Sequence, residues 1–534
     1  MNMNSKKLVS IFFILAVAVV SSISIRPVMA QADIYYRFTP TAIYDDGQDQ
    51  STLEIYTSGN ITSVTIKPDF ADEPVYQLYD DGSNGDRTAG DSVYSLGGIN
   101  PSMYPDDLLF PIAYNDQNTV DLATLWLTAT VTYTSGQSEE ISFIALKIVS
   151  PKLIFPVEQA SGGLAATEYA FFITDPAGET YTGSFPNITD YNGPAIAKKF
   201  YSIYPDEFDF INFMVVRGDL GMKAHAGGLR NPAANIGLNR TDYTAEYGSQ
   251  GRLLAMMYSG FELLNHEVGH AWAAFAGETL GISNGSHWLG TTDINGVMSE
   301  GYETPDNLYF FSPNNDGTFK AGWSEASYAP LELYLMGMMP PEEVPDVHVL
   351  HDPDLTNTER VTANRVDTYT ITDIMNAAGG PRDPAYPAAQ TDFNLAVILL
   401  TDTEFSPAEY AYYSYLSREY AAQRDGNAMT NFYTATGGRG TITTRLADWG
   451  FPNTQGATAS TEETPLPEST PLIEAAPTTP PAQEAESDLQ ETVTTPEVAS
   501  SSRPVWKFPI CASFTGAFIL PLVVISSRPK SRKP

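Results

Sequence analysis

The chain has 534 residues, too many for a single compact core, which indicates two or three domains with accessory segments. Apolar residues make up 43% of it and aromatic residues 12%, which excludes a wholly disordered chain. Asp and Glu total 64 against 29 Lys and Arg, and the net charge of -35 argues against nucleic-acid binding. One Cys excludes internal disulfides and Cys-rich metal clusters, so a transition-metal site must use carboxylates and the six His.

Residues 1–30 have the order of an export signal. Lys6 and Lys7 precede an apolar run from Leu8 to Ile25, and small residues follow around Ala30. This order predicts a signal peptide and a mature chain outside the cytoplasm, with a retained N-terminal anchor as the alternative.

Residues 31–153 are expected to form an all-β sandwich domain. Short segments alternate polar and apolar residues, as in Leu125–Tyr133 and Ser142–Val149, with turn residues about every ten positions. The segment Tyr79–Tyr94 resembles a loop of immunoglobulin-like domains in bacterial surface proteins, which implies an Ig-like sandwich that positions or binds and does not catalyse.

The same loop is rich in carboxylates that can serve as calcium ligands. The candidates are Asp80, Asp81, Asp86 and Asp91. The glycine falls at the wrong offset for an EF-hand, and turns stabilised by Asx and Gly residues explain the same composition. Calcium is therefore predicted here only as a second cofactor, with an ordinary turn as the alternative.

Residues 154–452 contain the predicted metal-binding and catalytic residues. Apolar residues at helical spacing between Ser249 and Gly277 predict one long helix, and within it stands the sequence His266-Glu267-Val268-Gly269-His270. His266 and His270, four residues apart, lie on one face of a helix, so both imidazoles can bind the same Zn²⁺. Glu267, one position round the helix, can act as general base toward a water activated by the metal.

A catalytic zinc requires a third protein ligand and an open position. His287 follows a Gly-rich turn that can bring the chain back under the helix, and it is the preferred candidate. Glu300 and Glu332 are the alternatives, and His287 as an ordinary loop residue beside Trp288 stays open.

Other segments of this region predict an α+β domain. Phe208–Val216 and Asn394–Leu400 are apolar runs that fit buried strands, and Ala224–Gly228, with His225, fits an edge strand. Tyr328–Gly337 and Ser406–Gln423 fit helices with Pro in their first turns.

The His-Glu-x-x-His motif resembles that of the zincin metallopeptidases. A Met-containing turn at Gly296–Ser299 and the Tyr328–Gly337 block extend the resemblance, over about 200–450, to poorly characterised secreted bacterial metallopeptidases. The resemblance implies a zincin-like fold, a catalytic Zn²⁺ and peptide-bond hydrolysis. Tyr302 and Tyr328 are separate candidates for an assisting side chain. The His that follows the motif closely in metzincins is absent, since residue 276 is Ala.

The two C-terminal segments predict a tether. Residues 453–505 are rich in Thr, Pro, Glu, Ser and Ala, a composition typical of a disordered stalk. Residues 506–534 contain the apolar run Phe508–Ser526 followed by a basic tail, which predicts a transmembrane anchor at the cell surface. A buried hydrophobic strand is the alternative for that run.

Together these features predict a multidomain protein with a sandwich, an α+β zincin-like catalytic domain, a stalk and a membrane helix. The predicted function is a surface-tethered zinc endopeptidase acting on protein or peptide substrates. Two other functions stay open, which are an adhesion protein with a degenerate catalytic domain and a zinc hydrolase of a non-peptide amide.

Overall fold

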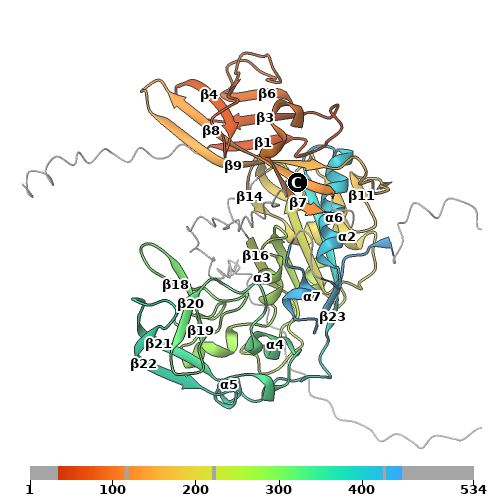
Figure 1. Cartoon of the computed structure of the whole chain (residues 1–534). Coiled ribbons are helices and arrows are strands. Elements are labelled where there is room, and N and C mark those ends of the chain that lie inside the picture. The colour runs from red at the N-terminus through yellow and green to blue at the C-terminus, as the bar shows by residue number, and fades with distance from the viewer. Residues whose placement is uncertain (1–33, 115–118, 219, 221–223, 425–428, 448–534) are drawn as a thin grey trace, which may run out of the picture. The chain divides into compact units, whose positions relative to one another are not determined.

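A computed structural model describes residues 34–114, 119–218, 220, 224–424 and 429–447. These residues are mostly β, with several sheets and few helices (Figure 1). The predicted signal peptide, stalk and C-terminal anchor lie outside the described residues. Within the described part, no helix is long and apolar enough to cross a membrane.

The N-terminal region folds into two sheets. One has the order β1-β3-β6, and the other has the order β2-β9-β8-β4-β5 with β7 also paired to β8. Their strands are β1 (Tyr35–Thr39), β2 (Ala42–Tyr44), β3 (Ser51–Tyr56), β4 (Ile61–Pro68), β5 (Tyr76–Leu78), β6 (Val93–Ile99), β7 (Leu109–Tyr114), β8 (Val120–Tyr133) and β9 (Ser138–Val149).

One hydrophobic core joins these two sheets. Phe38 and Ile55 come from the first sheet and Leu125 and Ile144 from the second, and all four side chains are buried in the same cluster. Alternate residues of each strand point to opposite faces, so the period-two pattern places one apolar face of each sheet toward the other.

The second region is built on an eight-stranded sheet. Its order is β10-β11-β12-β23-β15-β17-β16, and β24 also pairs with β23. Its strands are β10 (Glu158–Ala160), β11 (Leu164–Ala166), β12 (Phe171–Thr174), β15 (Phe210–Val215), β16 (Ala224–Gly228), β17 (Ala255–Ser259), β23 (Asp392–Thr401) and β24 (Thr441–Thr443). The predicted buried strands at 208–216 and 394–400 are confirmed as β15 and β23, and the predicted edge strand is β16.

Both faces of this sheet are covered. Residues 395–400 of β23 are fully buried and alternate between two separate cores, one on each side of the strand. Such a strand reads as a continuous apolar run because neither face meets water. The core on one side includes Leu264 and Val268 of helix α3 (Leu264–Gly269), whereas the other includes Ile196 and Phe200 of α2 (Gly193–Tyr201).

The prediction of one long helix over 249–277 is wrong. Residues 255–259 form β17, which pairs in parallel with β15 and antiparallel with β16, and only Leu264–Gly269 form an α-helix. A short apolar run fits a buried strand as well as a helix, and the neighbouring strands decide between them. The helix cannot continue to 277 because Ala274 adopts a left-handed backbone conformation with φ of +73°.

Smaller elements complete the fold. The predicted helices near 330 and 407 are confirmed as α4 (Pro330–Met336) and α6 (Pro407–Tyr420), each with Pro at its start. The remaining elements are α5 (Ile371–Ala377), α7 (Phe432–Ala435), the two-stranded sheets of β13 (Tyr181–Ser184) with β14 (Asn187–Tyr191) and of β21 (Val347–Asp354) with β22 (Thr362–Tyr369), and the three-stranded sheet of β18 (Tyr302–Glu303), β19 (Leu308–Pro313) and β20 (Phe319–Gly322).

Candidate metal centre

Helix α3 presents two histidines on one side. It follows β17 after a short turn and lies beside the edge strand β16 (Figure 1). Leu264 and Val268 anchor the helix in the core, whereas His266 and the C-cap residue His270 are only partly buried. The ring centroids of the two histidines are 4.8 Å apart, as expected for residues one helical turn apart.

His287 joins these two rings from a loop that is distant in sequence. Its ring centroid lies 5.0 Å from that of His266 and 4.9 Å from that of His270. One ligand atom from each of the three histidines lies within 4.8 Å of the other two. The Nε2 atoms of His266 and His287 are 3.0 Å apart. The three imidazoles therefore converge on one small volume.

Hydrogen bonds orient two of the rings. The Nδ1 atom of His266 is 2.9 Å from the carbonyl oxygen of Val297, and because a carbonyl can only accept, this nitrogen is the donor. The Nδ1 atom of His287 is 3.2 Å from Ser286 Oγ and 3.7 Å from Glu300 Oε1. Partners at Nδ1 direct Nε2 toward the shared volume, as the hydrogen-bond partners of metal-binding histidines commonly do.

The surroundings keep the three imidazoles neutral. Burial lowers the pKa of all three histidines. The pKa of His270 falls well below its ordinary value, and that of His287 falls to about 4. A neutral imidazole retains the lone pair that a metal ion requires, whereas a protonated one repels a cation. Near neutral pH, a cation therefore does not have to compete with protons for the nitrogen lone pairs of this cluster.

Glu267, which directly follows His266 in α3, has a buried carboxyl group. Its side chain is 3% exposed, and its Oε2 atom has no hydrogen-bond partner among the described residues. Burial raises the pKa of this carboxyl to about 8. A buried carboxyl oxygen without a partner is costly, and a nearby cation with its water would supply both charge and a hydrogen bond.

The two carboxylates considered as alternative third ligands have other partners. Glu300 accepts a hydrogen bond from Asn284 Nδ2 at 2.5 Å. Glu332 is fully buried and accepts hydrogen bonds from Trp288, Met298 and Ala329. Among the described residues, the group of converging ligand atoms contains the three histidines and neither of these carboxylates.

His225, which the sequence placed on a predicted edge strand and not among the metal ligands, lies near the cluster. It is partly buried on β16, opposite Tyr258 of β17, and its charge contributes to lowering the pKa of His270. Of the two tyrosines named as assisting side chains, Tyr328 is buried and donates its hydroxyl to the backbone oxygen of Asn265. Tyr302 lies on β18 and is partly exposed.

The turn containing Met298 packs beneath α3. A Cβ atom added at Gly269 would lie 2.4 Å from the Met298 sulfur and 3.2 Å from Tyr328 Cε1. Met298 is itself fully buried, so it has little room to move away. The glycine inside the His-Glu-x-x-His sequence therefore permits close contact between the helix and the turn.

We expect Gly269→Ala to lower the free energy of unfolding by about 1–3 kcal/mol, because the added methyl overpacks a filled core. The loss is measured as a lower thermal midpoint of the metal-free protein. Gly228→Ala is the matched control, since its Cβ would meet nothing within 4 Å, and its effect should stay within about 0.5 kcal/mol. Equal midpoints for the two variants would contradict this packing.

The structure brings together three of the four aspartates predicted as calcium ligands. One carboxylate oxygen from each of Asp80, Asp86 and Asp91 lies within 4.8 Å of the others, whereas Asp81 is not part of this group. Asp80 accepts hydrogen bonds from the backbone of Gly90 and residues 91–92, and Asp86 accepts from residues 82 and 88. These bonds stabilise the turns by themselves, and calcium at this loop stays a prediction.

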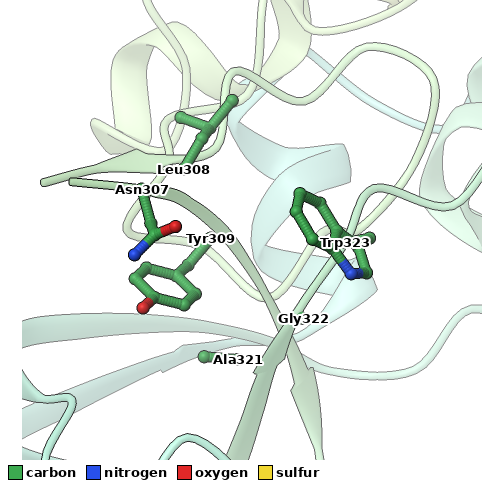
Figure 2. Close-up of a pocket in the computed structure, with 6 residues that line it drawn as sticks. All are labelled: Asn307, Leu308, Tyr309, Ala321, Gly322 and Trp323. Atoms are coloured by element: carbon green, nitrogen blue, oxygen red, sulfur yellow. The ribbon is translucent and has the colours of Figure 1, made fainter. Parts of the chain in front are cut away.

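A hollow of about 130 Å³ lies on the β19–β20 hairpin, and none of the predicted site residues lines it (Figure 2). Trp323, which is 72% exposed, lies on one side of it and Tyr309 on the other. The backbone oxygen of Trp323 accepts a hydrogen bond from Asn295 Nδ2, just before the Met298 turn. No histidine or carboxylate lines this hollow, so the histidine cluster is the better candidate for metal chemistry.

Comparison of the chain with models of known protein families gave no match, and comparison with curated proteins gave none either.

Proposed function

We propose that this protein is a zinc-dependent endopeptidase of the zincin type. The observation that carries the proposal is the convergence of His266, His270 and His287. The buried residue Glu267 directly follows His266 in the chain. The donor set consists of neutral imidazoles without a thiolate, which suits Zn²⁺ at a catalytic site with an open position.

The spacing of the ligand atoms supports zinc. Tetrahedral bonds of about 2.0–2.1 Å place two ligand nitrogens about 3.3 Å apart. The observed 3.0 Å between the Nε2 atoms of His266 and His287 is close to that value. The orphaned Oε2 atom of Glu267 is the second supporting feature, because a water held in the open position would be its natural donor.

A peptide is the substrate class that the fold supports best. Among the described residues, β16 is the last strand in the order of the eight-stranded sheet, where it pairs with β17. Its other side can pair with an extended peptide, and because β16 lies beside α3, that peptide would pass the histidine cluster.

Hydrolysis would need two roles, one supplied by the bound metal and one by Glu267. When bound, zinc acidifies a water molecule and polarises the scissile carbonyl. Glu267 removes the proton from the attacking water and later delivers it to the leaving amine. The pKa of about 8 that burial imposes on Glu267 would fall beside a cation, which suits a base that must accept and release a proton.

The proposed location follows from the termini of the chain. The sequence pattern of residues 1–30 favours export, and the apolar run with its basic tail in residues 506–534 favours a membrane anchor. The strongly acidic composition, with a net charge of -35, supports a soluble extracellular body that does not bind nucleic acid.

We expect the purified protein to cleave members of a mixed peptide library, and a chelator to abolish the cleavage. Zinc added back in slight excess should restore it, because the ligands are retained by the fold. Mass spectrometry of the products measures the result and reads the sequence preference. A protein that binds zinc but leaves every peptide intact would favour a non-peptide amide substrate, and one that neither binds zinc nor cleaves would favour adhesion.

A further inference from the structure

One fully buried carboxylate contacts both segments that support the histidine cluster. The Oε1 atom of Glu332 accepts from Trp288 Nε1 at 3.0 Å and from the Met298 backbone N–H at 3.0 Å. Its Oε2 atom accepts from the Ala329 backbone N–H at 2.7 Å, at the start of α4. The backbone of Val297, in the same turn as Met298, also donates to this carboxylate.

The donors to Oε1 are neighbours of two candidate ligands. Trp288 directly follows His287, and Met298 directly follows Val297, whose carbonyl accepts the hydrogen bond from His266. The two segments also contact each other, because the Trp288 backbone N–H donates to the Met298 carbonyl at 3.0 Å. A single oxygen thus links the loop that carries His287 to the turn that orients His266.

The turn at Gly296 packs closely against Glu332. A Cβ atom added at Gly296 would lie 2.5 Å from Glu332 Oε2 and 2.7 Å from the Ala329 nitrogen. Trp288 and Met298 are both fully buried. The turn can approach the carboxylate this closely only because residue 296 lacks a side chain.

We infer that Glu332 is a positioning residue that holds His266 and His287 at the separation needed to bind one metal ion. The inference rests on the proposed function for the identity of the metal. Glu332 itself contacts neither the metal nor the substrate. Its Oε1 atom holds the two segments that position His266 and His287, and its Oε2 atom caps α4. Loss of an outer-shell partner of this kind typically weakens metal binding by about 10–100-fold.

The chain offers a matched control in Glu409. Glu409 is also fully buried and also occupies the third position of a helix that starts with Pro, where it accepts from the Ser406 backbone N–H at 2.8 Å. Its other partners are Arg217 and Thr41, and neither belongs to the histidine cluster. Glu409→Ala thus removes a buried carboxylate and helix cap away from the proposed metal, and because it also leaves the buried Arg217 without its ion-pair partner, its loss of stability is expected to be the larger of the two.

The test measures zinc affinity of the full chain by competition with a chromophoric chelator, together with the thermal midpoint of the metal-free protein. We expect Glu332→Ala to bind zinc about 10–100-fold more weakly than wild type. Glu409→Ala should lower the midpoint and keep wild-type zinc affinity. Glu332→Gln retains one acceptor oxygen for Trp288 and Met298, so it should recover most of the affinity while the α4 cap stays broken.

Wild-type zinc affinity in Glu332→Ala, or an equal loss of affinity in Glu332→Ala and Glu409→Ala, would overturn the inference. If Glu332→Ala does not fold, Trp288→Phe removes one of the two Oε1 bonds and keeps an aromatic ring in the site, and unchanged zinc affinity there would overturn it equally. Zinc binding is measured without any substrate. A wild-type protein that binds zinc but cleaves no peptide would therefore overturn the proposed function alone.

Discussion

Replacement of Glu267 by Gln is expected to slow peptide cleavage by about 10²–10⁴-fold while the variant still binds zinc. The amide has nearly the same volume as the carboxyl group, so the buried pocket around it stays filled. It cannot accept a proton from water, because the amide is not basic. The three histidines are unchanged, so metal content should stay at about one zinc ion per chain.

The measurement is kcat/KM on the best library peptide, with zinc content determined on the same sample. Glu262→Gln provides the control, since Glu262 precedes the same helix, is exposed, and belongs to no group of converging ligand atoms among the described residues. It should cleave at the wild-type rate. Cleavage at the wild-type rate by zinc-loaded Glu267→Gln would remove Glu267 as the general base.

The second large effect concerns the metal itself. We expect His270→Ala to lose both zinc and cleavage, because two imidazoles alone do not hold a zinc ion against a chelating buffer. Zinc content after dialysis should fall from about one ion per chain to nearly none. The fold should persist, since the His270 ring is partly exposed and α3 is anchored by Leu264 and Val268.

His351→Ala is the control for removing an imidazole in general. His351 lies on β21, where its Nε2 atom is 2.8 Å from Asp367 Oδ2, and it is not part of the converging group among the described residues. This variant should retain zinc and activity. His287→Ala should resemble His270→Ala, and zinc retained there would show that a carboxylate such as Glu300 can replace the third imidazole.

Local patterns in the sequence predicted several elements of the fold. The apolar runs at β15 and β23 indicated buried strands because neither face of these strands meets water. Pro at the first position of α4 and α6, with Glu three residues after the N-cap, marked the starts of two helices, because these features act within one helical turn.

The long helix predicted over 249–277 shows where such patterns fail. The apolar residues from Leu253 to Met257 fit a buried helix and a buried strand equally well. Pairing with β15 and β16 makes them a strand, and these partners are remote in sequence. No local signal in the chain specifies which segments will lie side by side in the sheet.

The sequence by itself determined which types of side chain are available as metal ligands. Its one Cys leaves imidazoles and carboxylates as metal ligands, and the spacing of His266 and His270 brings two imidazoles together within a single helical turn. The tertiary structure alone decided what completes that pair. The loop from Gly281 to Trp288 brings His287 to it. Hydrogen bonds from Trp288, Met298 and Ala329 engage the buried carboxylate of Glu332, which we infer to be a support rather than a ligand. The physical reason is that a helix fixes neighbours four residues apart, whereas contacts over longer separations depend on packing of the whole core.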